Sequence, residues 1–323
     1  MPTRTYSSIS EAAAALPPKP LHLAIGMFDG VHLGHHAVIE AAVHSARRSG
    51  GIAGVLTFWP HPSRLFRPDH PVRLIMTPSL KTRQLAWLGI DAVITEAFDA
   101  DYAAITAEEF LPRLKRALPE LTTVYVGENW RFGQGRRGDT QLLVAEGKKH
   151  GIVVVSAPRI NQNGEPISST RIRTYLEEGR VEEANALLGY TYFAEGVVAP
   201  GKQLGRQLGF PTLNVVWEPD LRPRFGVYAV LVSGAAAASP LPAVANYGLR
   251  PTVEDSVIPR LEIHVLAPCP FDAGDALSIE WLGFLRPEQK FADVAALRAQ
   301  IAADREAALA WFARTGANSV HRA

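Results

Sequence analysis

The stretch Ile25-Gly26-Met27-Phe28-Asp29-Gly30-Val31-His32-Leu33-Gly34-His35-His36 decides how the first half of the chain folds. It follows an apolar run over 21–25 and precedes apolar residues at helical spacing over 38–46. This pattern predicts a strand, a tight glycine turn and a helix. Glycine lets backbone N–H groups approach an anion, and the helix directs the positive end of its dipole to the same place. We therefore expect a phosphate to bind at this turn.

Two histidines, His32 and His35, stand three residues apart at the start of the expected helix. This spacing puts both side chains on one helix face, where they can reach the same phosphate group. Two imidazoles beside a phosphate can stabilise the charge that develops at an α-phosphorus during nucleotide transfer. The alternative interpretation is a plain glycine turn with histidines solvated at a helix start.

The remainder of the first half alternates apolar strand-like runs with helical segments. Further strands are expected at 52–58, 92–95, 123–126 and 152–156, and helices at 36–49, 79–88, 106–118 and 140–150. Thr106 and Glu109 have the spacing of a capping box. The alternation predicts a Rossmann-like α/β domain with a parallel sheet covered on both faces. Ligands bind beyond the carboxyl ends of such strands, which is where the opening motif lies.

Two loops at the same sheet edge carry aromatic and polar residues. Phe58 and His61 follow the second expected strand, and the alternatives are a proline-stiffened connection or a wall for a planar ligand. Asn129 and Arg131 lie in a loop with three arginines and four glycines after the fourth expected strand. That loop is either a plain solvated connection or a cradle for an anionic aromatic ligand.

The character of the chain changes near residue 188. Strand-like runs then dominate, with one terminal helix over 294–312. The runs are 192–198, 212–216, 226–232, 243–247, 261–266 and 277–285. They predict a small antiparallel six-stranded β-barrel with a terminal helix. We expect two domains, residues 1–187 and residues 188–323.

Bulk properties narrow the class of protein. A length of 323 residues with 47% hydrophobic residues suits two folded domains. A net charge of +1 gives no overall field for nucleic acid, and no signal peptide or membrane span is recognisable. The single cysteine, Cys269, rules out an intrachain disulfide and suits a reducing compartment. We expect a cytoplasmic protein without nucleic-acid or membrane partners, and the oligomeric state stays open.

In its first half the chain resembles the bacterial bifunctional riboflavin kinase/FAD synthetase family, within the HxGH nucleotidyltransferases. The resemblance rests on residues 26–35 and on Ile167-Ser168-Ser169-Thr170-Arg171-Ile172-Arg173, which is similar to a motif that closes over nucleotide phosphates. It implies an FMN adenylyltransferase in which His32, His35 and Arg171 are catalytic. The implied ATP-binding residues are Gly26, Phe28, Asp29, Gly34, Ser169 and Thr170, and the implied flavin-binding residues are Phe58, His61, Asn129 and Arg131.

The second half resembles the riboflavin kinase part of the same family. Gly209-Phe210-Pro211-Thr212-Leu213-Asn214 is similar to its Gly-Phe-Pro-Thr-Ala-Asn motif, with Leu213 in place of alanine. The resemblance implies that Thr212 and Asn214 approach Mg²⁺ and the phosphates, and strand alternation puts these two side chains on one face. It also implies an ATP flap that includes Gly201, Lys202, Gly205 and Arg206. A near match to a P-loop over 196–202 is discounted because Gln203 stands where a Ser or Thr is needed.

Two later motifs complete the resemblance. Leu261-Glu262-Ile263-His264 is similar to the family's Leu-Glu-x-His, which implies that Glu262 is the general base for the ribityl hydroxyl. The segment 284–291 resembles a family motif near the flavin and implies that Arg286 binds flavin. The family's Leu-Tyr-Gly before the last strand is absent, since 272–274 reads Asp-Ala-Gly.

The resemblance implies a bifunctional enzyme of flavin cofactor synthesis. It would phosphorylate riboflavin with ATP to give FMN, and then adenylylate FMN with ATP to give FAD and pyrophosphate, with Mg²⁺ as the metal. One alternative is an FMN adenylyltransferase whose kinase half is weak or only binds flavin. Others are a non-catalytic flavin-binding protein and an adenylyltransferase for a different phosphorylated acceptor.

Overall fold

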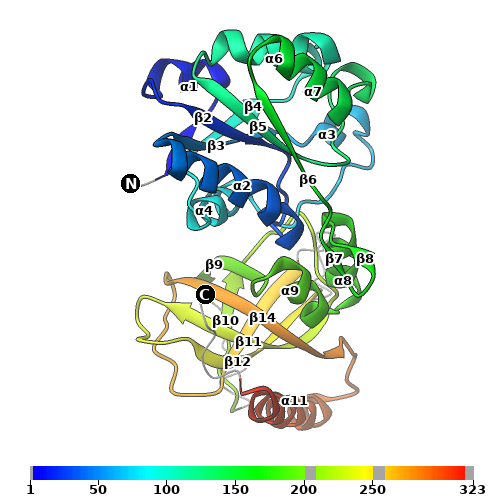
Figure 1. Cartoon of the computed structure of the whole chain (residues 1–323). Helices are drawn as coiled ribbons and strands as arrows, with labels where there is room; N and C mark the ends of the chain where they lie inside the picture. Colours follow the sequence, from blue (N-terminus) through cyan, green and yellow to red (C-terminus); the bar gives the residue numbers. More distant parts are fainter. Residues whose placement is uncertain (1–2, 201–208, 250–258, 317–323) are drawn as a thin grey trace. The chain divides into compact units, whose positions relative to one another are not determined.

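The computed structural model describes residues 3–200, 209–249 and 259–316. Two compact units divide the chain, residues 1–169 and residues 170–323. The first is an α/β unit and the second contains an antiparallel barrel (Figure 1).

A six-stranded parallel sheet with the order β1-β4-β3-β2-β5-β6 forms the centre of the first unit. The strands are β1 (Arg4–Tyr6), β2 (Leu21–Ile25), β3 (Ile52–Trp59), β4 (Ala92–Ala97), β5 (Leu121–Gly127) and β6 (Val153–Ala157). β2 is fully buried, as expected for an apolar strand at the middle of a covered parallel sheet. The expected Rossmann-like parallel sheet is confirmed.

Helices cover both faces of this sheet, with α2 and α4 on one face and α1, α6 and α7 on the other (Figure 1). The helices of the unit are α1 (Ile9–Ala15), α2 (Leu33–Ser49), α3 (Pro62–Phe66), α4 (Pro78–Trp87), α5 (Ala100–Ala103), α6 (Ala107–Ala117) and α7 (Thr140–Lys149). Thr106 caps α6 as expected, because its hydroxyl accepts from the Glu109 backbone N–H at 3.3 Å. The Glu109 carboxylate bonds to the Thr106 hydroxyl at 3.1 Å, whereas in a capping box it bonds to the backbone N–H of the N-cap residue.

The strand order places the glycine turn. β2 pairs with β3 on one side and with β5 on the other. After β2 the chain adds β3 and β4 on one side of it, and then adds β5 and β6 on the other side. Such a reversal opens a crevice beyond the carboxyl ends of the strands. The turn between β2 and α2 therefore lies at the place where open α/β sheets bind ligands.

Six antiparallel strands close into a barrel in the second unit, in the order β10-β13-β12-β11-β14-β9. The strands are β9 (Phe193–Ala199), β10 (Leu213–Val216), β11 (Gly226–Gly234), β12 (Leu241–Leu249), β13 (Pro259–Val265) and β14 (Ala276–Pro287). Trp281, Tyr228 and Tyr247 are fully buried. Helix α11 (Val294–Thr315) packs Trp311 and Phe312 against Ala229, Leu231 and Leu282. The expected barrel with a terminal helix is confirmed.

Two helices before the barrel belong to its compact unit, which begins at Thr170. They are α8 (Ser169–Glu178) and α9 (Val181–Leu188). The Asn185 side-chain amide explains part of this packing, because it donates to the Trp281 carbonyl at 2.8 Å and accepts from the Tyr192 backbone N–H at 2.7 Å. The compact unit therefore starts earlier than residue 188, and a functional boundary at 187/188 stays a prediction.

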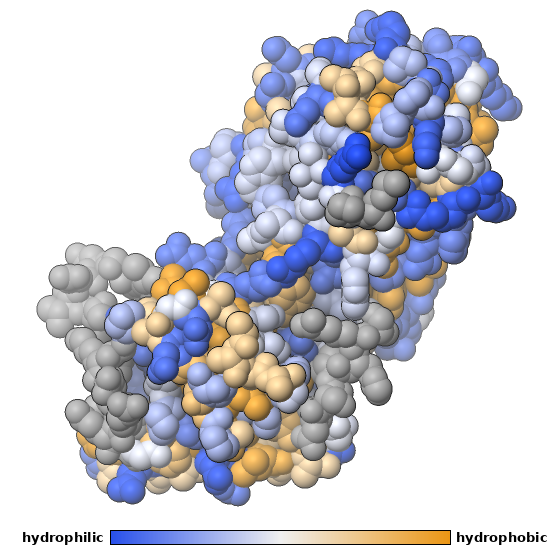
Figure 2. Space-filling view, turned by 90° about the vertical axis from the view of Figure 1, so that its left-hand side faces the viewer, coloured by the Kyte–Doolittle hydropathy of each residue, from blue (hydrophilic) through white to orange (hydrophobic). Residues whose placement is uncertain are grey.

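The sequence did not predict several short elements. They are β1, α1, α3, α5, the 3₁₀ turn η1 (Gln134–Arg136) and the hairpin strands β7 (Asn161–Gln162) and β8 (Glu165–Pro166). Hydrophilic and hydrophobic residues are interspersed on the face drawn in Figure 2. Within the ranges that the structure describes, no helix has the length and apolar character needed to cross a membrane.

Candidate functional site

The turn between β2 and α2 has an unusual backbone. Phe28, Gly30 and Val31 have positive φ angles of 50°, 82° and 34°. Positive φ in a residue with a side chain costs of order 1–3 kcal/mol and persists only where the surroundings impose it. At Gly26 a Cβ would lie 3.0 Å from the Phe28 ring, so glycine lets that ring fold back over the turn. The turn is thus strained and depends on its neighbours.

Asp29 ties this turn to two distant segments. Its carboxylate is 5% exposed and accepts from the Ile75 backbone N–H at 3.1 and 3.2 Å. Its backbone carbonyl accepts from the Ser169 hydroxyl at 2.9 Å. Two residues that the sequence predicted for the ATP site, Asp29 and Ser169, are therefore in direct contact.

The predicted catalytic histidines lie against each other. The ring centroids of His32 and His35 are 3.6 Å apart with an interplanar angle of 15°, and the Phe28 ring contacts His35 edge-on at 5.3 Å. His32 is the N-cap residue of α2 and is 4% exposed. At Gly34 a Cβ would lie 3.1 Å from the His32 ring and 3.2 Å from the Ile167 carbonyl. The motif thus packs two imidazoles at a helix N-terminus, where phosphate binding is favoured.

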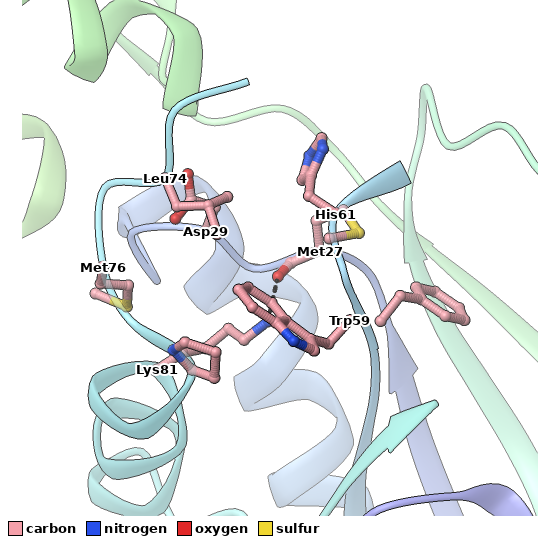
Figure 3. A pocket seen from close by; sticks show the side chains of 9 residues that line it. Met27, Asp29, Trp59, His61, Leu74, Met76 and Lys81 are labelled. Carbon is pink, nitrogen blue, oxygen red and sulfur yellow. Dashed lines mark hydrogen bonds between the residues drawn. The ribbon is translucent and has the colours of Figure 1, made fainter. Parts of the chain in front are cut away.

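A pocket opens beside the turn (Figure 3). It is lined by Met27, Asp29, Phe58, Trp59, His61, Leu74, Met76, Pro78 and Lys81. The predicted flavin residues Phe58 and His61 therefore meet the turn here. Phe58 also contacts the Tyr102 ring at 5.3 Å. The His61 ring accepts from the Ser63 backbone N–H at 3.1 Å as the N-cap of α3.

Lys81 also lines this pocket, and no sequence motif indicated it. Its side chain comes from α4, is 8% exposed, and donates to the Thr57 hydroxyl at 2.8 Å and to the Met27 carbonyl at 3.2 Å. Burial lowers the pKa of Lys81 to about 8, against the opposing charge of Asp29. No motif or spacing marks this lysine, because lysine on an amphipathic helix is ordinarily a solvated residue.

The second flavin loop lies apart from the pocket lining. Asn129 and Arg131 are exposed, and Arg131 pairs with Asp139 at 3.5 Å. Between them Trp130 stacks on Phe132 with centroids 4.7 Å apart. The loop is thus organised by its aromatic residues.

Thr170 and Arg171 begin the second compact unit, on α8. The Arg171 Nε donates to the Tyr175 hydroxyl at 2.9 Å, one helical turn further on. The Arg180 guanidinium lies 4.2 Å from the centroid of the same ring. Tyr175 therefore fixes the orientation of Arg171 from within the helix.

The predicted kinase residues meet on adjacent barrel strands. In register, Glu262 on β13 stands opposite Asn214 on β10 and opposite Asn246 on β12. Leu261 and Ile263 are buried while Glu262 and Asn214 are half-buried, so the carboxylate lies on the face opposite to the packed interior. Directly opposed residues share a face of the sheet. Carboxylate and amide oxygens in this arrangement suit Mg²⁺, which takes oxygen ligands.

Among the other residues predicted to bind the metal or ATP in the kinase, the structure describes only Thr212. Thr212 is exposed and lies one residue before β10. The predicted flap residues Gly201, Lys202, Gly205 and Arg206 lie outside the described residues.

Arg286 forms an internal ion pair. Its Nε and one terminal nitrogen donate to the two carboxylate oxygens of Asp304 at 2.6 and 2.7 Å, and Gln300 donates to the same carboxylate at 2.9 Å. Another guanidinium nitrogen donates to the Pro287 carbonyl at 2.9 Å. This arrangement joins α11 to β14, and the sequence did not predict Asp304 as a partner.

Comparison with known proteins supports two functional parts. The family model described as FAD synthetase matches residues 16–171, and that described as riboflavin kinase matches residues 188–312. The bifunctional riboflavin kinase/FMN adenylyltransferase of Escherichia coli strain K12 is 38% identical over 294 residues, covering 91% of this chain and 93% of its own. The Bacillus subtilis protein of the same name is 33% identical, with 90% and 92% covered.

One solved structure is similar over nearly the whole chain. It is described as a macrolide-efflux protein from Streptococcus pneumoniae, with a TM-score of 0.85 and 27% identity. The match covers 96% of this chain and 100% of that one. The arrangement of an α/β unit followed by a closed barrel is therefore shared with a known fold.

Proposed function

The chain belongs to the bifunctional riboflavin kinase/FMN adenylyltransferase family, and we propose how its residues divide the two reactions. As a member it makes FMN from riboflavin and FAD from FMN, and ATP is a substrate of both steps. We assign adenylyl transfer to the turn between β2 and α2, and riboflavin phosphorylation to the Asn214–Glu262 pair of the barrel.

In adenylyl transfer, a phosphate oxygen of FMN attacks the α-phosphorus of ATP. The bond from that phosphorus to the oxygen that bridges it to the β-phosphate breaks, and pyrophosphate leaves. This step needs no protein nucleophile, because positioning and charge stabilisation supply the rate. We assign the charge stabilisation to His32, His35 and Arg171. The role of the two histidines is supported by the stacking of their rings and by their position at the N-terminus of α2.

The remaining residues of the first site are assigned to binding. Gly26, Phe28, Asp29 and Gly34 shape the turn for ATP, and Ser169 and Thr170 contact its phosphates. Phe58, His61, Asn129 and Arg131 bind the flavin. The lining of one pocket by Asp29, Phe58 and His61 supports this assignment for these three residues.

In the kinase reaction, the 5′-hydroxyl oxygen of riboflavin attacks the γ-phosphorus of ATP and ADP leaves. We assign the acceptance of the hydroxyl proton to Glu262. Its half-buried position between Asn214 and Asn246 in the strand register supports this role. Gly201, Lys202, Gly205 and Arg206 are assigned to ATP by resemblance alone, and Arg286 to the flavin.

We further assign Mg²⁺ to the kinase site, held by Thr212 and Asn214. When bound, the ion would neutralise negative charge on the transferred phosphoryl group. The oxygen donors on β10 and β13 support this assignment.

The functional boundary is placed between residues 187 and 188, and the protein is assigned to the cytoplasm.

The strained turn that carries the stacked histidines is the observation that most strongly supports this account. ATP labelled at one phosphate tests it. With riboflavin as the acceptor, a γ-phosphate label should enter FMN, and an α-phosphate label should enter FAD and never FMN. If an α-phosphate label is absent from every flavin product, the assignment of adenylyl transfer is wrong.

A further inference from the structure

Lys81 is a buried charge that neither proposed reaction uses. We propose that Lys81 is a positioning residue for adenylyl transfer. Lys81 holds the Met27 carbonyl and thereby fixes the turn that carries Asp29, His32 and His35. The inference rests on the proposed function of this turn. It assigns a task to a residue outside the motifs that identify the family here.

The contacts form a closed triangle. Lys81 Nζ donates to the Thr57 hydroxyl at 2.8 Å and to the Met27 carbonyl at 3.2 Å, and the Thr57 hydroxyl donates to the same carbonyl at 3.2 Å. Figure 3 shows Lys81 extending from α4 to this carbonyl. One backbone oxygen of the turn is therefore held from two separate elements, α4 and β3.

We call the bonds from Lys81 and Thr57 to the Met27 carbonyl the Lys81–Thr57 clamp. The clamp matters because this carbonyl lies next to the strained part of the turn. Met27 directly precedes Phe28, which has a φ of 50°, and Val31 in the same turn has a φ of 34°. Such conformations persist where the surroundings impose them. The Lys81–Thr57 clamp acts just before the strained residues, and the bond from the Ile75 N–H to Asp29 acts within them. Together they hold the turn from the side of α4.

The nature of the side chain argues against a role in packing alone. A charged lysine that is only 8% exposed carries a desolvation cost, which a methionine of similar length would avoid. If Lys81 only filled space, its replacement by methionine would therefore raise the free energy of unfolding of the protein. The charge is instead placed against a carbonyl of the turn, and Asp29 and His61 line the same pocket.

The test compares Lys81→Met with a matched lysine. Lys115 on α6 also donates to two backbone carbonyls, of Pro119 and Leu121, at 2.7 and 2.8 Å. We expect Lys81→Met to lower kcat for FAD formation from FMN about 10- to 100-fold, with KM for FMN and ATP changed less than about 3-fold. FMN formation by the same protein and the urea midpoint should not fall. Lys115→Met should leave kcat for FAD formation unchanged.

A second pair of variants tests the clamp without altering Lys81. Thr57→Val removes the hydroxyl and should lower kcat for FAD formation, whereas Thr57→Ser keeps it and should restore most of the rate. The inference is overturned if Lys81→Met and Thr57→Val both keep kcat within about 3-fold, or if kcat falls only in parallel with the urea midpoint. A wild-type protein that makes no FAD from FMN would overturn the proposed function itself, and the inference with it.

Discussion

His32 and His35 stack with their ring centroids 3.6 Å apart, and a side chain on Gly34, which stands between them in the sequence, would crowd the His32 ring. A Cβ at this glycine would lie 3.1 Å from the His32 ring and 3.2 Å from the Ile167 carbonyl. The stacking of the imidazoles and the close approach of the 167–169 segment therefore depend on the same residue.

Gly34→Ala should consequently impair FAD formation. The added methyl group must displace His32 or the Ile167 segment by a few tenths of an ångström, and misplacement of catalytic groups is costly. We expect kcat for FAD formation to fall at least about tenfold, measured with FMN and ATP at saturation. FMN formation from riboflavin in the same preparation is the control and should be unaffected. An unchanged rate of FAD formation would mean that the histidine geometry is not critical.

The ion pair between Arg286 and Asp304 should stabilise the second unit. Asp304→Asn leaves a largely buried guanidinium without its counter-charge, which costs about 3 kcal/mol in the free energy of unfolding. Glu306→Gln is the matched control, since it removes an exposed partner of Arg305 and should cost less than about 1 kcal/mol. Urea unfolding followed by tryptophan fluorescence measures both. Equal effects of the two substitutions would contradict the prediction.

The buried ammonium of Lys81 should make stability depend on pH in the alkaline range. Its pKa is about 8 in the folded protein, against 10.5 for a lysine exposed to water, so between these values the unfolded chain binds more protons. The free energy of unfolding should therefore rise from pH 8 to pH 10.5, by on the order of 3 kcal/mol for this group.

Comparison of the wild type with Lys81→Met isolates this contribution, because other groups titrate alike in both proteins. The difference in unfolding free energy should be constant below about pH 7.5 and then change in favour of the wild type up to pH 10.5. A difference that stays constant across this range would show that the ammonium is not desolvated.

The strand and helix pattern allowed most of the first unit to be predicted, because buried parallel strands are apolar along their whole length. β1 was missed for the opposite reason. Its three residues carry no apolar run, and the segment is held by long-range bonds such as Thr3 to the Ile90 carbonyl and the Arg4 N–H to the Asp91 carbonyl. Short edge strands of this kind are set by tertiary pairing, which one sequence does not display.

The functional residues divide in the same way. His32, His35 and Glu262 stand in contiguous motifs, so their candidacy was visible in the sequence. Lys81 and Asp304 act through partners from distant segments. In the sequence each resembles an ordinary charged residue on the solvent-exposed face of a helix. Burial distinguishes them, and burial follows only from the packed structure.

The central claim is that the two reactions use separate sets of residues, with the histidines of the α/β unit in one and Glu262 of the barrel in the other, and one pair of variants tests it most directly. Purified His35→Ala and Glu262→Gln would each be incubated with ATP and Mg²⁺, once with riboflavin and once with FMN, and the flavins separated by chromatography. His35→Ala should form FMN at the wild-type rate and little FAD from either flavin. Glu262→Gln should form FAD from FMN at the wild-type rate and almost no FMN from riboflavin. Loss of both activities in either well-folded variant, or retention of FAD formation in His35→Ala, would contradict the account.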